Sequence, residues 1–213
     1  MAILIVSAPS WAQRGGGGGN SWYVGEEPDH KLDFIVFGGY VWSSSIDVFI
    51  PAPVNAWGNV DFKSSGFYGF EADINLRGGT QLMLLWQRQD TKLEGKSGGV
   101  TTDLGDAFVE YWHVGAVHGV LRDKLMPYTS LSLGATRSAV EGGDDSWKFS
   151  VMFGLGAKYY INERIGLRAA ARLPFTFLNG GVGVSIGSGG VSPAAGGTGM
   201  WAFDLSLGLI IAI

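Results

Sequence analysis

Hydrophobic and polar residues alternate with a period of two along much of the chain, whereas helical periodicity is poor. Between residues 201 and 213 large apolar side chains occupy every second position, and small or polar side chains fill the others except at Ile210. Residues 165–177 repeat this rule, with Arg168 and Arg172 on the second face. Because successive side chains of a β-strand point to opposite faces, both segments are predicted to be strands.

Six further segments show the same alternation, which brings the predicted strands to eight. They are residues 34–42, 68–76, 81–87, 107–117, 128–136 and 147–161. The phase of the segment 107–117 is ambiguous, because Glu110 suggests one phase and Trp112 and Val114 would then point inward with it. A β-bulge within this segment would reconcile the two.

The predicted connections fall into two groups by length. Long connections are expected over residues 43–65, 90–106 and 179–199, with one of intermediate length over 140–146. Short connections are expected over residues 77–80, 119–125 and 162–164. Long loops at one rim and tight turns at the other are typical of an outer-membrane β-barrel.

Alternation alone does not decide which face meets the surroundings, and the main rival is a soluble up-and-down barrel of the lipocalin type. Such a barrel needs many Lys and Glu residues outside, but here the second face is mostly Gly, Ser, Ala and Thr with scattered charges. Small side chains suit the lining of a narrow barrel. The first face is almost free of charge, as hydrocarbon demands, since a charge there would cost about 2–4 kcal/mol near the midplane.

Aromatic residues on the apolar face support the same choice. Six of them lie at strand ends next to the longer loops, and they are Trp42, Tyr68, Trp86, Trp147, Phe177 and Trp201. Tyr159 marks the opposite rim. Belts of Trp and Tyr are expected where a protein crosses both surfaces of a membrane, so these seven residues are predicted to form an aromatic girdle.

Composition agrees with a membrane barrel and argues against nucleic-acid binding and cysteine chemistry. Only 16% of the 213 residues are charged, against about 25% in a typical soluble domain, and the mean hydropathy is +0.17. No apolar stretch reaches the length of roughly 18 residues that a transmembrane helix needs. The net charge of −4 and the lack of a Lys/Arg cluster argue against nucleic acid as a partner, and the absence of cysteine removes disulfides and thiolate chemistry.

The first residues differ in character from the rest. Residues 2–6 are apolar, and Ser10 and Ala12 are small residues at the −3 and −1 positions of a possible signal-peptidase cut. We therefore interpret residues 1–12 as a residual signal peptide and residues 13–30 as a flexible, glycine-rich segment, with the barrel domain over 31–213.

Two stretches carry a resemblance to known proteins. Residues 126–136 contain a Pro-Tyr pair, alternating leucines and a Gly-Ala pair, and residues 153–168 contain Gly-Ala-Lys-Tyr-Tyr-Ile-Asn. They resemble the small outer-membrane β-barrel family of the OmpA/OmpX/OmpW kind, over roughly residues 31–213. The resemblance implies an all-β, eight-stranded, antiparallel up-and-down transmembrane barrel in a bacterial outer membrane, with both termini in the periplasm. The chain departs from the family at Ile213, where an aromatic residue read by the barrel-assembly machinery is usual.

Charged residues on the second face are candidates for the interior of the barrel. They are Glu71, Asp73, Glu110, Lys158, Arg168, Arg172 and Asp204. Buried charges need partners, so an ion-pair network that plugs the lumen is predicted, with Asp204 beside Arg168 or Arg172 and Asp33 nearby. A charged, gated conduit is the sharper alternative.

Catalytic, metal and cofactor sites are not predicted. His30, His113 and His118 lack a Ser or acid partner at informative spacing, and the two later ones are expected at the surface or in the girdle. The first functional hypothesis is a non-enzymatic, monomeric outer-membrane protein with a structural or surface-contact role. Its partners would be outer-membrane lipids, lipopolysaccharide and the barrel-assembly machinery. The alternatives are a narrow, OmpW-like channel for small or apolar solutes and, less favoured, a lipid-modifying enzyme.

Overall fold

The computed structural model describes residues 28, 30–43, 46–50, 56–97, 100–140, 145–177, 183–187, 190–194 and 199–213. The proposed signal peptide, residues 1–12, and most of the glycine-rich segment, residues 13–30, lie outside the described residues. Eight long strands dominate the described chain: β1 (Leu32–Ser43), β4 (Ser65–Asn75), β5 (Thr80–Ser97), β6 (Val100–Gly119), β7 (Leu125–Val140), β8 (Ser146–Tyr160), β9 (Ile165–Phe177) and β12 (Gly199–Ala212). Four short strands accompany them: β2 (Ile46–Ile50), β3 (Ala56–Phe62), β10 (Gly183–Gly187) and β11 (Gly190–Ala194).

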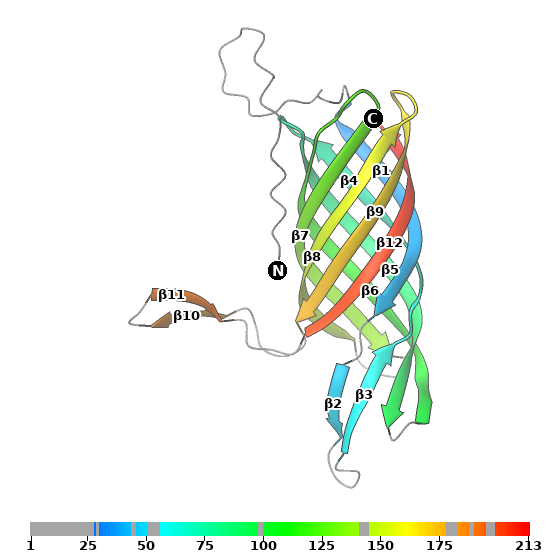
Figure 1. Ribbon diagram of the computed structural model, residues 1–213, viewed down its shortest axis with the longest axis vertical. Coiled ribbons are helices and arrows are strands. Elements are labelled where there is room, and N and C mark those ends of the chain that lie inside the picture. The colour runs from blue at the N-terminus through cyan, green and yellow to red at the C-terminus, as the bar shows by residue number, and fades with distance from the viewer. Residues whose placement is uncertain are drawn as a thin grey trace, which may run out of the picture.

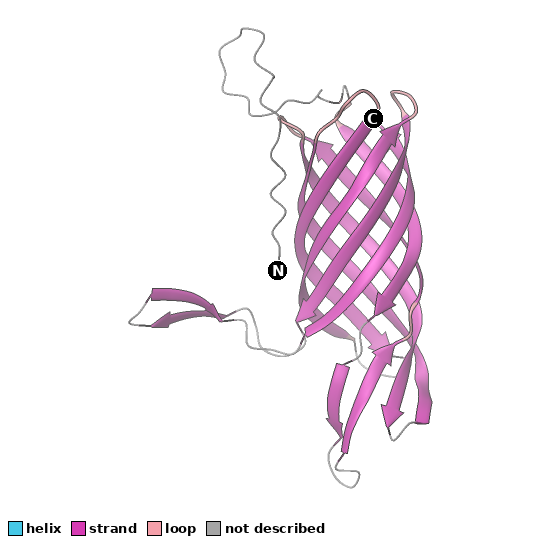
Figure 2. Cartoon of the chain, in the orientation of Figure 1, coloured by secondary structure: helices cyan, strands magenta, loops and turns pink. Residues whose placement is uncertain are grey.

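The eight long strands form one closed, antiparallel barrel (Figure 1). Each strand pairs with the long strand that follows it in the sequence, and β1 closes the ring by pairing with β12 from Asp33↔Ala212 to Ser43↔Ala202. Figure 2 shows strands and connections with no helix. In the described residues no helix is long and apolar enough to cross a membrane. The predicted eight-stranded antiparallel barrel is confirmed.

Side chains on the apolar face point away from the barrel, as predicted. On β12, Leu205, Leu207 and Leu209 are 44%, 72% and 47% exposed. Asp204 and Ser206, on the other face of the same strand, are 0% and 5% exposed. A wall of exposed leucine is unfavourable in water but matches hydrocarbon. The small and ionic side chains therefore fill the interior, and the lipocalin-type alternative is excluded for this barrel.

Several boundaries differ from those predicted. Residues 90–106 are not a long loop, because β5 and β6 continue past the barrel as a hairpin up to Ser97↔Val100. The short strands β2 and β3 form a second hairpin within the expected loop 43–65, and β3 pairs with β5. The extension of β5 and β6 is mainly polar and carries no apolar alternation, and β2 is only five residues long, so the pattern did not reveal them.

The ambiguous phase of residues 107–117 does not come from a bulge. This part of β6 pairs with β5 and β7 without any shift, and the irregularity lies further along, between Leu93 and Glu94 of β5. Gly105, opposite this point, has a φ of 123°, which only glycine adopts readily. Trp112 and Val114 are outward-facing and about half exposed.

Inward-facing glycines leave space for aromatic side chains in the interior. A Cβ on Gly156 would lie 2.3 Å from the carbonyl oxygen of Ala169 and 2.7 Å from the ring of Tyr128. The wall is thus thin where an aromatic side chain packs against it. Glycine is required here by close approach rather than by turn geometry.

We predict that Gly156→Ala destabilises the folded barrel by about 1–3 kcal/mol, because the backbone of β9 cannot move aside without breaking the ladder. Gly66→Ala is the matched control, since its Cβ would lie 3.6 Å from the nearest atom. Urea unfolding in detergent measures both free energies. Equal stability of the two variants would contradict the packing account.

Candidate functional site

Six of the seven predicted interior charges face the lumen. They come from four strands, Glu71 and Asp73 from β4, Lys158 from β8, Arg168 and Arg172 from β9, and Asp204 from β12, and each is at most 3% exposed. Ionised groups this deeply buried persist only with partners of opposite charge and with hydrogen bonds. The contacts of these groups define the site.

Lys158 connects opposite walls of the barrel near the end with the short turns. Its Nζ donates to Asp33 Oδ2 at 2.7 Å, to Asp73 Oδ2 at 2.8 Å and to Gln81 Oε1 at 2.7 Å. The hydroxyl of Tyr160 donates to the same Asp33 oxygen at 2.8 Å. One ammonium group therefore joins β8 to β1, β4 and β5 across the lumen.

Two arginines continue the network from Lys158 towards the end with the long connections. Arg168 Nη2 lies 3.0 Å from Glu71 Oε2, and its Nε donates to the hydroxyl of Tyr128 at 2.8 Å. Arg172 Nε donates to Asp204 Oδ1 at 2.9 Å. The strand register dictates this last pair, because Arg172 and Asp204 are direct cross-strand neighbours on β9 and β12.

The ring of Phe37 contacts both arginines. The guanidinium carbons of Arg168 and Arg172 lie 5.1 Å and 4.6 Å from its centre. An aromatic face attracts a cation most strongly where water is excluded. Phe37 thus fills space and adds electrostatic stabilisation to the same charges that Glu71 and Asp204 neutralise.

Glu110 corrects one prediction. It lies in the same phase as Trp112 and faces outward, at the rim next to the long connections. Its carboxylate oxygens accept from Arg88 Nη1 at 2.9 Å and Arg137 Nη1 at 3.3 Å, its direct cross-strand neighbours. Its low exposure goes with the contacts to these two arginines, whose guanidinium groups also lie over the ring of Phe108. At a rim, the outward face is no longer apolar, so a charge there does not reveal its phase.

His113 corrects another expectation, since it lies in the interior and not at the surface or in the girdle. Its Nδ1 lies 3.0 Å from Ser132 Oγ and its Nε2 lies 2.8 Å from Ser150 Oγ. His118, on the same strand, faces outward as expected. His113 therefore joins β6 to β7 and β8 through two hydroxyl groups.

Asp33 was expected near Asp204, but other members of the network were not predicted. Gln81, near the start of β5, looked like an ordinary polar residue of the second face. Tyr128 and Tyr160 supply hydroxyl groups to Arg168 and Asp33. Only barrel closure shows which residues on distant strands meet in the lumen.

The predicted girdle residues all face outward. Trp42, Tyr68, Trp147, Tyr159 and Trp201 are exposed, and Trp86 and Phe177 are half-buried against neighbouring rings. Trp112 was not predicted in the girdle but contacts Trp86 at a centroid distance of 6.1 Å. Aromatic pairs between adjacent strands stabilise a sheet and suit a membrane interface.

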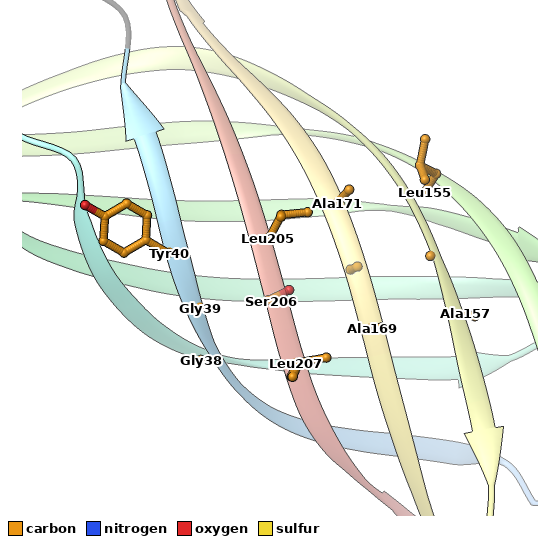
Figure 3. Close-up of a pocket in the computed structure, with 12 residues that line it drawn as sticks. Gly38, Gly39, Tyr40, Leu155, Ala157, Ala169, Ala171, Leu205, Ser206 and Leu207 are labelled. Carbon is orange, nitrogen blue, oxygen red and sulfur yellow. The ribbon is translucent and has the colours of Figure 1, made fainter.

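One hollow of about 740 Å³ lies on the outer wall and not in the lumen (Figure 3). Its floor is made of small residues such as Gly38, Ala157 and Ala169, and Leu205 and Leu207 stand beside them. Its lining is apolar, as expected of the surface that meets lipid. Among the described residues no group of three His, Cys, Asp or Glu side chains is arranged to hold a metal ion.

Comparison with known proteins bears on the fold alone. No family model and no curated protein matches the chain. Among solved structures, the outer membrane protein OprG from Pseudomonas aeruginosa matches with a TM-score of 0.57 and 14% identity, over 88% of this chain and 99% of that one. Neisserial surface protein A matches with a TM-score of 0.54 and 14% identity, over 85% and 97%. The outer membrane protein AlkL matches with a TM-score of 0.50 and 12% identity, over 95% and 97%.

The chain therefore has the fold of the small outer-membrane β-barrels. At the level of fold, this confirms the resemblance on which the sequence interpretation relied. The identities are too low to transfer any activity, ligand or partner from these proteins.

We predict that Lys158→Met destabilises the barrel by about 3–5 kcal/mol, because Asp33 and Asp73 would be left buried without a cation. The exposed substitution Lys124→Met is the control and is expected to change the unfolding free energy by less than about 0.5 kcal/mol. The triple variant Lys158→Met/Asp33→Asn/Asp73→Asn should recover part of the loss. A Lys158→Met barrel as stable as the control would show that these contacts are dispensable.

Proposed function

We propose that the chain is an integral outer-membrane protein with a plugged lumen, which acts as an envelope scaffold and makes surface contacts through the end with the long connections. The observation that carries this proposal is the set of ion pairs that cross the lumen from Lys158 and Arg168, together with the Arg172–Asp204 pair on adjacent strands. An eight-stranded barrel is just wide enough for side chains to fill it. Charges of both signs then stabilise the interior and leave no wide path for solutes.

The outward surface supports insertion into a membrane. Exposed apolar side chains cover the barrel between the aromatic residues of the long-connection end and Tyr159 at the other end. All backbone groups of the eight strands can pair within the closed ring. In our proposal the short turns and both chain ends face the periplasm and the long connections face outward, as the loop asymmetry of such barrels suggests. Outer-membrane lipids, lipopolysaccharide and the barrel-assembly machinery would be the partners of a monomer.

A non-enzymatic role fits the interior best. His113 is the described residue that most resembles a general base, but the side-chain contacts that hold it are two serine hydroxyls deep in the wall. A catalytic base needs access to substrate and usually an acid that orients it. The buried arginines and carboxylates are likewise engaged with one another rather than open to a substrate.

Planar-bilayer conductance tests the plugged lumen. We expect purified wild-type protein to show no stepwise currents, because passage of an ion would require cross-lumen ion pairs to break. The variant Lys158→Ala/Asp73→Ala/Arg168→Ala/Glu71→Ala removes ion pairs that cross the lumen and should open measurable steps. It serves as the positive control, provided that its heat-dependent gel mobility shows a folded barrel.

Wild-type steps as large as those of the opened variant would overturn the scaffold proposal in favour of the channel. A heat-dependent mobility shift in both proteins separates this outcome from a failure to insert. Turnover of labelled phospholipid by the purified wild-type barrel would instead favour the enzyme.

A further inference from the structure

The two ends of the barrel differ in how their basic residues are neutralised. At the end with the short turns, labelled C in Figure 1, five basic side chains are exposed: Lys31, Arg77, Arg122, Lys124 and Arg164. The described part of the chain provides no ion pair to any of them. Asp123 and Glu163 are the exposed acidic residues among the same described turns. We call these five basic side chains the basic ring.

At the opposite end four basic residues have carboxylate partners, whereas Lys148 has no ion pair among the described residues. Lys63 lies 3.5 Å from Glu94, and Lys92 lies 3.6 Å from Asp106. Arg88 and Arg137 share Glu110, and each also contacts an aspartate, Asp90 and Asp145 respectively. Most of the positive charge of this end is therefore compensated within the protein, in contrast to the basic ring.

The basic ring lies directly where the apolar surface ends. Arg77 follows Leu76, Lys124 precedes Leu125, and each of these leucines is about half exposed on the outer wall. Each of the three short connections carries at least one member. Long basic side chains at such a boundary can extend their charged ends to the level of lipid headgroups while their stems remain on apolar surface.

We infer that the basic ring binds anionic phospholipid headgroups of the membrane leaflet at the short-turn end. A phosphodiester headgroup offers these side chains the ion-pair partner that the described residues do not give them, and each Lys or Arg near an anionic surface contributes about 1 kcal/mol. The chain as a whole has a net charge of −4, so this attraction depends on the local ring and not on overall charge. The inference rests on the proposed membrane insertion and adds a lipid class to it.

Lipid selectivity of the full chain tests the inference. The protein is reconstituted in phosphatidylcholine vesicles with spin-labelled phosphatidylglycerol or phosphatidylcholine of identical acyl chains. The motionally restricted fraction then gives the preference at the barrel surface. For the wild type we expect about fivefold preference for phosphatidylglycerol at low salt, the equivalent of one basic residue per bound lipid. The experiment uses the full chain, so the acidic residues Glu26, Glu27 and Asp29, which lie outside the described residues, contribute to the measured preference.

The decisive variant is Arg77→Gln/Arg122→Gln/Lys124→Gln/Arg164→Gln, for which the preference should fall to about one. The pair Arg122→Gln/Arg164→Gln has a matched control in Lys63→Gln/Lys92→Gln, which removes the same charge from the other end. The first pair should lower the preference clearly more than the second. Salt at about 1 M, where the screening length is about 3 Å, should abolish the preference of the wild type.

An unchanged preference in the fourfold variant, or equal effects of the two pairs, would overturn the inference. Inorganic phosphate added at constant ionic strength should leave the preference unaltered, and a fall would assign the ring to free phosphate instead. A heat-dependent mobility shift in every variant shows that it has inserted. Failure to bind anionic lipid is thereby distinguished from failure of the membrane proposal.

Discussion

Hydrogen bonding of the backbone is the constraint on which the rest of the structure depends. Hydrocarbon offers no partner to an N–H or C=O group, so a sheet can cross it only when its first and last strands meet. The pairing of β1 with β12 achieves this over their shared length. Closure gives every strand one face towards lipid and one towards the lumen. Alternate residues along the sequence therefore lie in these two environments.

The interior satisfies a second constraint, since closure brings charges from distant strands together without water. Lys158 meets Asp33 and Asp73 from the far wall, and Arg172 meets Asp204 from the next strand. Ion pairs of this kind add little net stability compared with apolar packing, but loss of one member is costly. The interior therefore favours one register of the strands, and its aromatic rings fit only where the wall is glycine.

Much of this could be predicted from local pattern. Alternation identified all eight strands and the outward face, because every second residue of a strand such as β12 shares one environment. Adjacency of the last two strands predicted that Asp204 pairs with Arg168 or Arg172, and the strand register selects Arg172. The partners of Lys158 could not be predicted in this way, because they depend on which walls face each other across the ring. The prediction for Glu110 was wrong for a different reason. Where a strand extends past the apolar surface at the rim, both of its faces meet polar surroundings, so a charged residue no longer shows which face points inward.

The central claim is that Leu205, Leu207 and Leu209 face hydrocarbon on a closed barrel. The chain has no cysteine, so single cysteines at these positions can be spin-labelled without background. In reconstituted vesicles the labels should be accessible to oxygen, which concentrates in hydrocarbon, and shielded from a water-soluble nickel complex. A label at Glu163, in an exposed turn, should show the reverse. Free access of the nickel complex to all three leucine positions would contradict the account.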